Sequence, residues 1–259
     1  MLMNRRDVNP RVDESEDVNP VLIKCKPMNY NKIKVIAFDA DDTLWNNEPY
    51  FRNAEHELCR MLAPYGTEEE LSERIFGVEM ANMPDYGYGA IAFTMSLIES
   101  AIKISEGKVT ATEISEIIEM GRQLLRLDAK PLDGVAETLQ ALKDTGRYRL
   151  VVFTKGELLT QGNKLKRSGL RPCFDKVFIV TDKTEEQYRD LCREMGIVPE
   201  ELLMVGNSLK SDILPALNIG ASTIYIPYEI MWQHEVIDHF EHEQMRQVGS
   251  IRELVSLLQ

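Results

Sequence analysis

The chain lacks the features that mark membrane and secreted proteins. None of its apolar runs approaches the roughly 20 residues that a membrane-spanning helix needs. Arg5 and Arg6 near the N-terminus are not followed by an apolar segment, so we expect no secretory signal. The 4 cysteines form no C-x-x-C pair, which favours reduced thiols over a disulfide or zinc framework. These absences predict a cytoplasmic protein.

The chain also has fewer basic than acidic residues. The chain has 30 Lys and Arg against 42 Asp and Glu, a formal net charge of -12. Nucleic acid and anionic membranes attract proteins with a basic surface, so we expect neither as a partner. An anionic substrate remains compatible with this charge, because a metal ion or a few local cations can reverse the sign inside a cleft.

The 259 residues are enough for one domain or two, and their pattern divides them into three parts. Residues 1–30 are polar and read as a flexible N-terminal extension. Residues 31–45 and 131–259 carry short apolar runs that alternate with amphipathic segments, which predicts strands and helices of one α/β core. Residues 46–130 carry apolar residues at helical spacing and predict a separate helical domain.

The apolar runs of the core are rich in Val and Ile and show little polar alternation, as in strands that are covered on both faces. They lie at 34–38, 148–154, 176–180, 201–206 and 222–226, with helical patterns at 135–143, 158–168, 185–195 and 213–217. Repeated strand–helix–strand units predict a parallel sheet with right-handed crossovers. About a hundred residues separate the first two strands, far more than a crossover needs. The helical patterns within them lie at 54–62, 69–76, 90–104 and 112–127.

Polar residues follow each of the first four apolar runs. In a parallel sheet these ends meet at one edge, where ligands bind. They are Asp39, Asp41 and Asp42 after the first run, Thr154, Lys155 and Gly156 after the second, Asp182 and Lys183 after the third, and Asn207, Ser208, Ser211 and Asp212 after the fourth. Each residue alone has an ordinary explanation as a turn, cap or solvated residue. Four consecutive strand ends that supply metal-binding oxygens and phosphate-binding donors favour an active site.

The arrangement resembles the haloacid dehalogenase superfamily, most of whose members are magnesium-dependent phosphatases. "FDADDTL", "VVFTKG", "DKTEEQY" and "MVGNSLKSDILPALNIG" are similar to its four motifs, in order, across roughly residues 33–228. The resemblance implies a Rossmann-like, three-layer α/β core with a central parallel sheet and an α-helical cap inserted after the first strand.

The resemblance also implies residue roles. Asp39 would be the nucleophile that forms an aspartyl-phosphate, and Asp41 the general acid and base. Thr154, Lys155 and Lys183 would bind the phosphoryl oxygens. Asp39, the backbone carbonyl of Asp41, Asn207 and Asp212 would hold Mg²⁺. Asp42 and Thr43 would shape the turn after the strand.

One position departs from the family pattern. Asn207 stands where the family's usual metal ligand is Asp, so this ligand brings an oxygen without charge. The expected function is a Mg²⁺-dependent phosphatase acting on a small phosphorylated metabolite. A non-catalytic module that binds a phosphorylated ligand is an alternative that Asn207 suggests. A phosphomutase or phosphonatase is another, although Lys103 and Lys108 give no clear sign of the cap lysine that a phosphonatase needs.

A phospho-signalling receiver also places acids, Thr and Lys at strand ends, but it is about half this length and has no large insert. The cap is expected to select the substrate, with Tyr86 or Tyr88 lining the site. His239 and His242 are expected on a solvated helix, because "HEVIDHFEH" lacks the spacing of a zinc site.

The general-acid role predicts a dependence on the leaving group. Asp41→Asn should lower kcat for alkyl phosphates by about 10²- to 10⁴-fold, because their alkoxides leave only when protonated. Aryl phosphates with acidic phenols should lose far less. Steady-state kinetics on both classes measures the difference, and an equal loss on both would refute the assignment.

Overall fold

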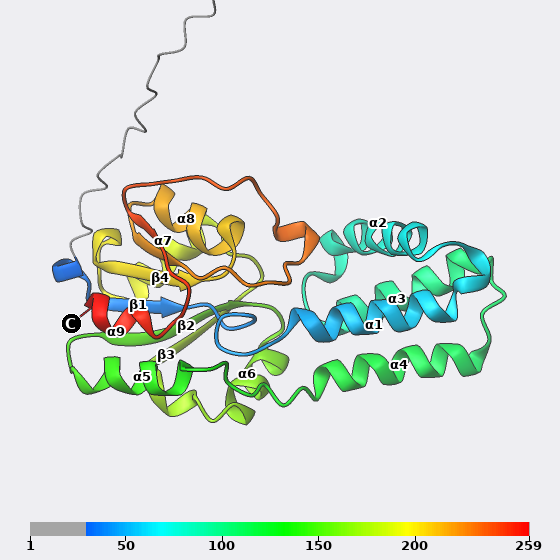
Figure 1. Ribbon diagram of the computed structural model, residues 1–259, viewed down its shortest axis with the longest axis horizontal. Helices are drawn as coiled ribbons and strands as arrows, with labels where there is room; N and C mark the ends of the chain where they lie inside the picture. The colour runs from blue at the N-terminus through cyan, green and yellow to red at the C-terminus, as the bar shows by residue number, and fades with distance from the viewer. Residues whose placement is uncertain (1–29, 259) are drawn as a thin grey trace, which may run out of the picture.

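The computed structural model describes residues 30–258 and shows a single parallel sheet with a helical part at one end (Figure 1). The predicted extension, residues 1–30, lies outside the described residues except for Tyr30. The sheet has six strands in the order β3-β2-β1-β4-β5-β6, and every neighbouring pair is parallel. The strands are β1 Val35–Phe38, β2 Arg149–Lys155, β3 Lys176–Val180, β4 Leu202–Gly206, β5 Ser222–Tyr225 and β6 Met245–Gln247.

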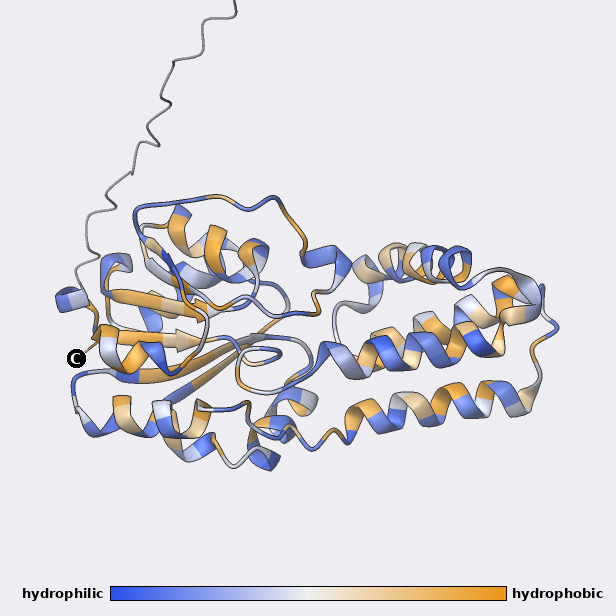
Figure 2. Cartoon of the chain, in the orientation of Figure 1, coloured by the Kyte–Doolittle hydropathy of each residue, from blue (hydrophilic) through white to orange (hydrophobic). Residues whose placement is uncertain are grey.

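Strand β1 lies in the middle of the sheet and is buried on both faces. Its residues pair in register with β2 on one side and β4 on the other, so Phe38 lies opposite both Val152 and Val205. Alternate side chains enter different cores, with Ile36 and Phe38 in one cluster and Val35 and Ala37 in the other. This is why the strand reads as an unbroken apolar run, and Figure 2 shows the central strands largely in orange, the colour of hydrophobic residues.

Helices cover both faces of the sheet, which confirms the predicted three-layer α/β core. Apolar side chains of α5, α6 and α9 belong to the core on one face, and those of α7 and α8 to the core on the other. The helices are α5 Val135–Asp144, α6 Leu158–Arg167, α7 Glu185–Met195, α8 Leu214–Asn218 and α9 Glu253–Leu258.

The segment between β1 and β2 forms four helices that extend away from the sheet (Figure 1). They are α1 Glu48–Met61, α2 Glu68–Tyr86, α3 Ala90–Ile104 and α4 Ala111–Leu125. Their buried side chains, from Ala54 to Leu124, form a hydrophobic core of their own. The predicted helical cap is therefore confirmed. Its boundaries at 46 and 130 stay a prediction, because the four helices occupy only residues 48–125 of that insert.

Several elements differ from the prediction in extent. Helix α1 begins six residues before the predicted 54, and α2 continues beyond 76 to Tyr86, with Pro84 in its last turn. Strand β6 and helix α9 were not predicted, because elements of three and six residues are too short for a clear periodic signal. The expected helix around His239 and His242 is wrong: residues 236–244 form no helix, and only Gln233–Glu235 make one 3₁₀ turn.

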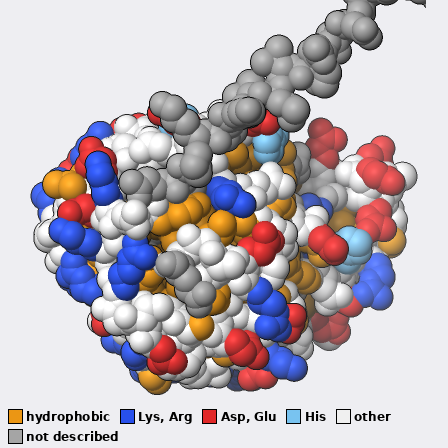
Figure 3. Space-filling model, turned by 60° about the vertical axis from the view of Figure 1, so that its left-hand side comes forward, with side chains coloured by type: hydrophobic (Ala, Val, Ile, Leu, Met, Phe, Trp, Pro, Cys, Tyr) orange, Lys and Arg blue, Asp and Glu red, His pale blue; other side chains and the backbone are white. Residues whose placement is uncertain are grey.

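The surface carries charged side chains of both signs. On the described part of the face in Figure 3 they are spread over the molecule, with apolar side chains between them. Among residues 30–258, no helix is long and apolar enough to cross a membrane.

The close approach of α3 and α4 depends on Gly121. A Cβ at Gly121 would lie 2.1 Å from Oγ1 of Thr94, so Gly121→Ala must push the two helices apart. We expect it to lower the free energy of unfolding by about 1–3 kcal/mol, as other overpacked cores do. A Cβ at Gly77 in α2 would meet no atom of another element within 4 Å, and Gly77→Ala should stabilise the helix by about 0.5–1 kcal/mol. Denaturation followed by circular dichroism measures both, and equal stability of the two variants would contradict this packing.

Candidate active site

The predicted site residues come together at one edge of the sheet. They line one cavity of about 180 Å³, which lies between the carboxyl ends of the strands and the cap. The predicted residues that line it are Asp39, Asp41, Tyr86, Tyr88, Thr154, Lys155, Lys183, Asn207 and Asp212. The shared location follows from the parallel sheet, and the roles of these residues stay predictions.

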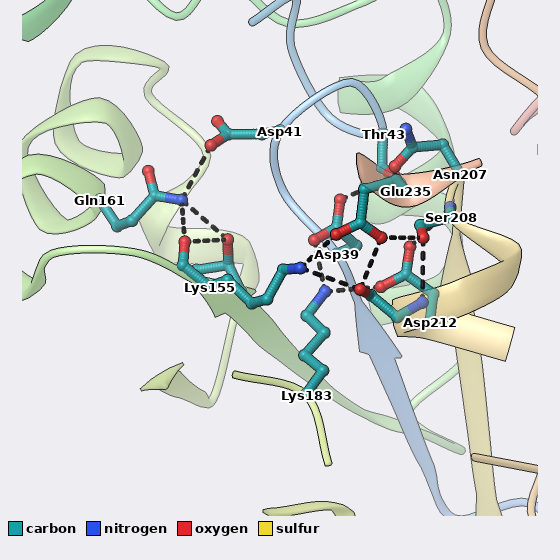
Figure 4. A network of polar contacts seen from close by, with 12 residues as sticks. Asp39, Asp41, Thr43, Lys155, Gln161, Lys183, Asn207, Ser208, Asp212 and Glu235 are labelled. Carbon is teal, nitrogen blue, oxygen red and sulfur yellow. Dashed lines mark hydrogen bonds and ion pairs between the residues drawn. The ribbon is translucent and has the colours of Figure 1, made fainter. Parts of the chain in front are cut away.

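A buried ion triad lies at the centre of the site (Figure 4). The Lys183 ammonium lies 2.5 Å from Oδ1 of Asp39 and 2.6 Å from Oδ1 of Asp212. The side chain of Lys183 is 1% exposed. Lys183 follows β3, so it reaches past β2, where its ammonium lies 5.6 Å from the centre of the Phe153 ring. Three strand ends are therefore joined by one cation.

Burial and charge act in opposite directions on this triad. Burial raises the pKa of Asp39, the Lys183 ammonium opposes this rise, and the carboxylates of Asp212 and Asp41 add to it. Burial would lower the pKa of Lys183, but Asp212 and Asp39 together raise it above its usual range. Asp39 and Asp212 thus share one lysine, which leaves one negative charge of the triad unbalanced and favours a further cation.

Thr43 connects Asp39 to the end of β4. Its hydroxyl lies 3.0 Å from Oδ2 of Asp39 and 3.1 Å from Oδ1 of Asn207. Thr43 was expected only to shape the turn, and these contacts place it beside two of the four predicted metal ligands. Asp42 has the expected turn role: its φ is 62°, and its carboxylate accepts hydrogen bonds from the backbone N–H groups of Asn47 and Glu48 at the start of α1.

The turn after β4 holds Asp212 in place. The segment Leu209–Ile213 is a π-helical turn, and the backbone N–H of Ser208 donates to Oδ2 of Asp212 at 2.9 Å. Gly206 makes room for this carboxylate, because a Cβ there would lie 2.2 Å from the same oxygen. A larger residue at 206 would displace Asp212 from Lys183.

Asp41 lies apart from the triad and has its own partners (Figure 4). Its carboxylate accepts hydrogen bonds from Trp45 Nε1 at 2.7 Å, from Gln161 Nε2 at 3.0 Å and from Lys164 Nζ at 2.9 Å. Gln161 Nε2 also donates to Oγ1 of Thr154 at 2.9 Å. The positions of two predicted residues, Asp41 and Thr154, are thus fixed by one amide of α6.

Gln161 and Lys164 were missed by the sequence analysis. They lie three positions apart on α6, so both face the cavity, and both are about 4% exposed. A lysine on the inward face of an amphipathic helix was the available signal, because lysine is almost never fully buried without a partner.

The Lys155 ammonium contacts side chains that are not part of the predicted phosphate site. Its ammonium pairs with Glu235, lies 2.9 Å from Oγ of Ser211 and sits 4.4 Å from the centre of the Tyr88 ring. Glu235 also accepts hydrogen bonds from the hydroxyls of Ser208 and Ser211. Burial would raise the pKa of Glu235, but Lys155 and these hydrogen bonds lower it to about 2. Glu235 therefore ties the end of β2 to the turn that carries Asp212.

Glu235 belongs to a segment that the sequence analysis did not assign to the site. Residues 226–235, "IPYEIMWQHE", run from β5 towards the cap. The Tyr228 hydroxyl donates to Asn46 at 2.7 Å, and the Trp232 and Tyr88 rings lie 5.8 Å apart, edge to face. The segment thus forms a wall of the cavity that contacts both core and cap.

The oxygens at the end of β1 and β4 suit a magnesium ion. Among residues 30–258 no three Asp, Glu, His or Cys side chains converge closely enough to hold a metal by themselves. The predicted donor set is two carboxylates, those of Asp39 and Asp212, with the neutral oxygens of Asn207 and the Asp41 backbone. Mg²⁺ is commonly bound in this way, through one or two carboxylates with waters and substrate phosphate.

Comparisons of the sequence and of the structure with known proteins agree on one family. The family model described as haloacid dehalogenase-like hydrolase matches residues 33–220. A haloacid dehalogenase-like family hydrolase from Xanthomonas campestris, solved by crystallography, is 33% identical with a TM-score of 0.77. The match covers 87% of this chain and 90% of that one.

Two curated relatives have phosphatase names. The glyceraldehyde 3-phosphate phosphatase of Methanothermobacter thermautotrophicus is 27% identical over 208 residues, which cover 76% of this chain and 87% of that protein. The N-acylneuraminate-9-phosphatase of Homo sapiens is 25% identical over 247 residues, which cover 90% of this chain and 96% of that protein.

The contacts of Glu235 predict an effect on metal binding. Glu235→Gln removes the charge that balances Lys155 and loosens the turn that carries Asp212. We expect Mg²⁺ affinity to fall by about 10- to 100-fold, as for other groups that orient metal ligands. Isothermal titration with Mg²⁺ measures it. Glu241→Gln, an exposed position in the same loop, is the matched control, and equal affinities in the two variants would contradict the role.

Proposed function

The chain belongs to the haloacid dehalogenase-like hydrolases, and we propose that it is a cytoplasmic, Mg²⁺-dependent phosphatase of a small phosphorylated metabolite. The observation that carries the proposal is Asp39, a buried carboxylate at the end of a central strand, held between Lys183 and Thr43. The phosphatase names of the relatives support the reaction class. The acidic net charge of -12 supports the absence of nucleic acid among its partners.

The first half of the reaction transfers the phosphoryl group to the protein. A carboxylate oxygen of Asp39 attacks phosphorus, and the bond between phosphorus and the ester oxygen breaks. Asp41 gives a proton to the leaving alkoxide, so the alcohol departs neutral. The contacts of Asp41 with Trp45, Gln161 and Lys164 hold its carboxyl group in one orientation for this transfer.

The second half releases phosphate. Asp41, now a carboxylate, takes a proton from water, and the water oxygen attacks phosphorus. The bond between phosphorus and Asp39 breaks, and the Asp39 carboxylate is restored. Lys183 and Thr154 bind the phosphoryl oxygens in both halves, and Lys183 offsets their charge at the point of attack.

Asp39, Asn207, Asp212 and the backbone carbonyl of Asp41 would hold Mg²⁺. The bound ion would supply positive charge between the Asp39 carboxylate and the incoming phosphate, which otherwise repel each other. The contact of Thr43 with both Asp39 and Asn207 orients these two ligands toward one point. Asn207 also keeps open the alternative of a phospho-ligand binding module, because it brings one charge fewer than Asp.

The proposal predicts metal-dependent turnover that requires Asp39. The chain should hydrolyse p-nitrophenyl phosphate and alkyl phosphates with Mg²⁺ and lose this activity with a chelator. Asp39→Asn should lower kcat on the order of 10⁴-fold or more, because the nucleophile is lost while the fold remains. Asp238→Asn, at an exposed carboxylate that does not line the cavity, is the control.

A folded, Mg²⁺-loaded protein that binds phosphate but turns over none of these esters would favour the binding module. The same measurement on Asn207→Asp then shows whether the missing charge is the reason, because this variant restores the usual family ligand.

A further inference from the structure

The part of the cavity beneath the cap differs in charge from the phosphate site. Nine Asp and Glu side chains line the whole cavity against four Lys and Arg side chains. Three of the acids, Glu48, Glu55 and Glu79, come from the cap helices α1 and α2 and lie beyond the triad. This region faces whatever organic group is attached to the phosphate.

Every cation that lines the cavity already has a carboxylate partner. Lys183 pairs with Asp39 and Asp212, Lys164 with Asp41, and Lys155 with Glu235. Arg52, the one cation that the cap contributes to this lining, lies 3.4 Å from Glu48 and donates to the backbone carbonyl of Met231. A second anionic group on the substrate would find no cation without an acidic partner in this lining.

The cap carboxylates act on one another. Burial and the neighbouring charges of Asp42 and Glu79 raise the pKa of Glu48 to about 8. Burial and the charge of Glu55 raise the pKa of Glu79 to about 7, although a hydrogen bond from Trp232 opposes this rise. These raised pKa values leave Glu48 largely protonated at neutral pH, and an ammonium group placed among the cap carboxyl groups would favour their ionised form and be stabilised by it.

Aromatic side chains complete the walls. Trp232 and Tyr88 meet edge to face at 5.8 Å, and the Phe51 and Phe93 rings lie 5.0 Å apart. All four line the cavity. Aromatic rings beside carboxylates form a surface that attracts an ammonium group more than a second carboxylate or phosphate.

From the charge and lining of this cavity we infer that the substrate is a phosphate monoester of an amino alcohol, with its ammonium group bound between the cap carboxylates and Trp232. The inference rests on the proposed phosphatase function and names its substrate class. A substrate with a second anionic group is disfavoured, because its approach brings like charges together with no cation free to separate them.

Three esters of the same length test the inference. They are 2-aminoethyl phosphate, 2-hydroxyethyl phosphate and phosphoglycolate, which differ only in an ammonium, hydroxyl or carboxylate end. We expect kcat/KM to fall in that order, with at least a roughly tenfold difference between the ammonium and carboxylate esters. p-Nitrophenyl phosphate is assayed beside them with Mg²⁺.

A charge-removing variant assigns the preference to the cap. Glu79→Gln keeps the size of the side chain and should lower the ratio of ammonium to carboxylate turnover by about 5- to 10-fold. Glu73→Gln, at an exposed position of the same helix, should leave the ratio unchanged. Glu55→Gln provides a second variant on another helix, and circular dichroism checks that each variant folds.

The outcomes separate the two proposals. Turnover of p-nitrophenyl phosphate together with a carboxylate or hydroxyl ester that matches or exceeds the ammonium ester overturns the inference and leaves the phosphatase. A preference that persists unchanged in both Glu79→Gln and Glu55→Gln also overturns it. No turnover of any ester by the Mg²⁺-loaded protein overturns the proposed function, and the inference with it.

Discussion

The structure depends on one buried cation, the ammonium of Lys183, which lies between Asp39 and Asp212. A buried charge that loses its partner typically costs about 3–5 kcal/mol, so all three side chains must be in place together. This requirement explains features far apart in the sequence: the central position of β1, the reach of Lys183 past β2, and the glycine at 206 that leaves room for Asp212. The same arrangement places Asp39, the proposed nucleophile, beside a cation where phosphate would bind.

The sequence predicted the centre of the site because that centre follows from strand ends. Asp39, Thr154, Lys183 and Asp212 lie at or shortly after the ends of apolar runs, and a parallel sheet brings such ends to one edge. It could not predict Glu235 or Gln161 in the same way. Their contacts depend on a loop after β5 and on the rotation of α6, and neither is set by hydrophobic periodicity.

The helices also differ in how far local sequence patterns predicted them and how far long-range packing decided them. Helix α3 was predicted within its observed bounds, Ala90–Ile104, because its apolar face is regular. The longer α2 continues through residues 77–86, where Gly77 and Pro84 suggest a loop, and packing against α3 decides the outcome. Tyr88 lies two residues after this extension, so the cap wall that is proposed to contact the substrate is the part that local patterns describe least.

The core and the cap therefore make separate contributions. In this proposal the core supplies the reacting groups, whereas the acidic, aromatic region beneath the cap would select among phosphate esters. The central claim is that Asp39 carries the phosphoryl group, and rapid acid quenching during turnover of p-nitrophenyl phosphate with Mg²⁺ tests it most directly. The account predicts a phosphorylated peptide whose modified residue is Asp39. Turnover at the full rate with a phosphoryl group on another residue, or with none at Asp39 at any quench time, would contradict it.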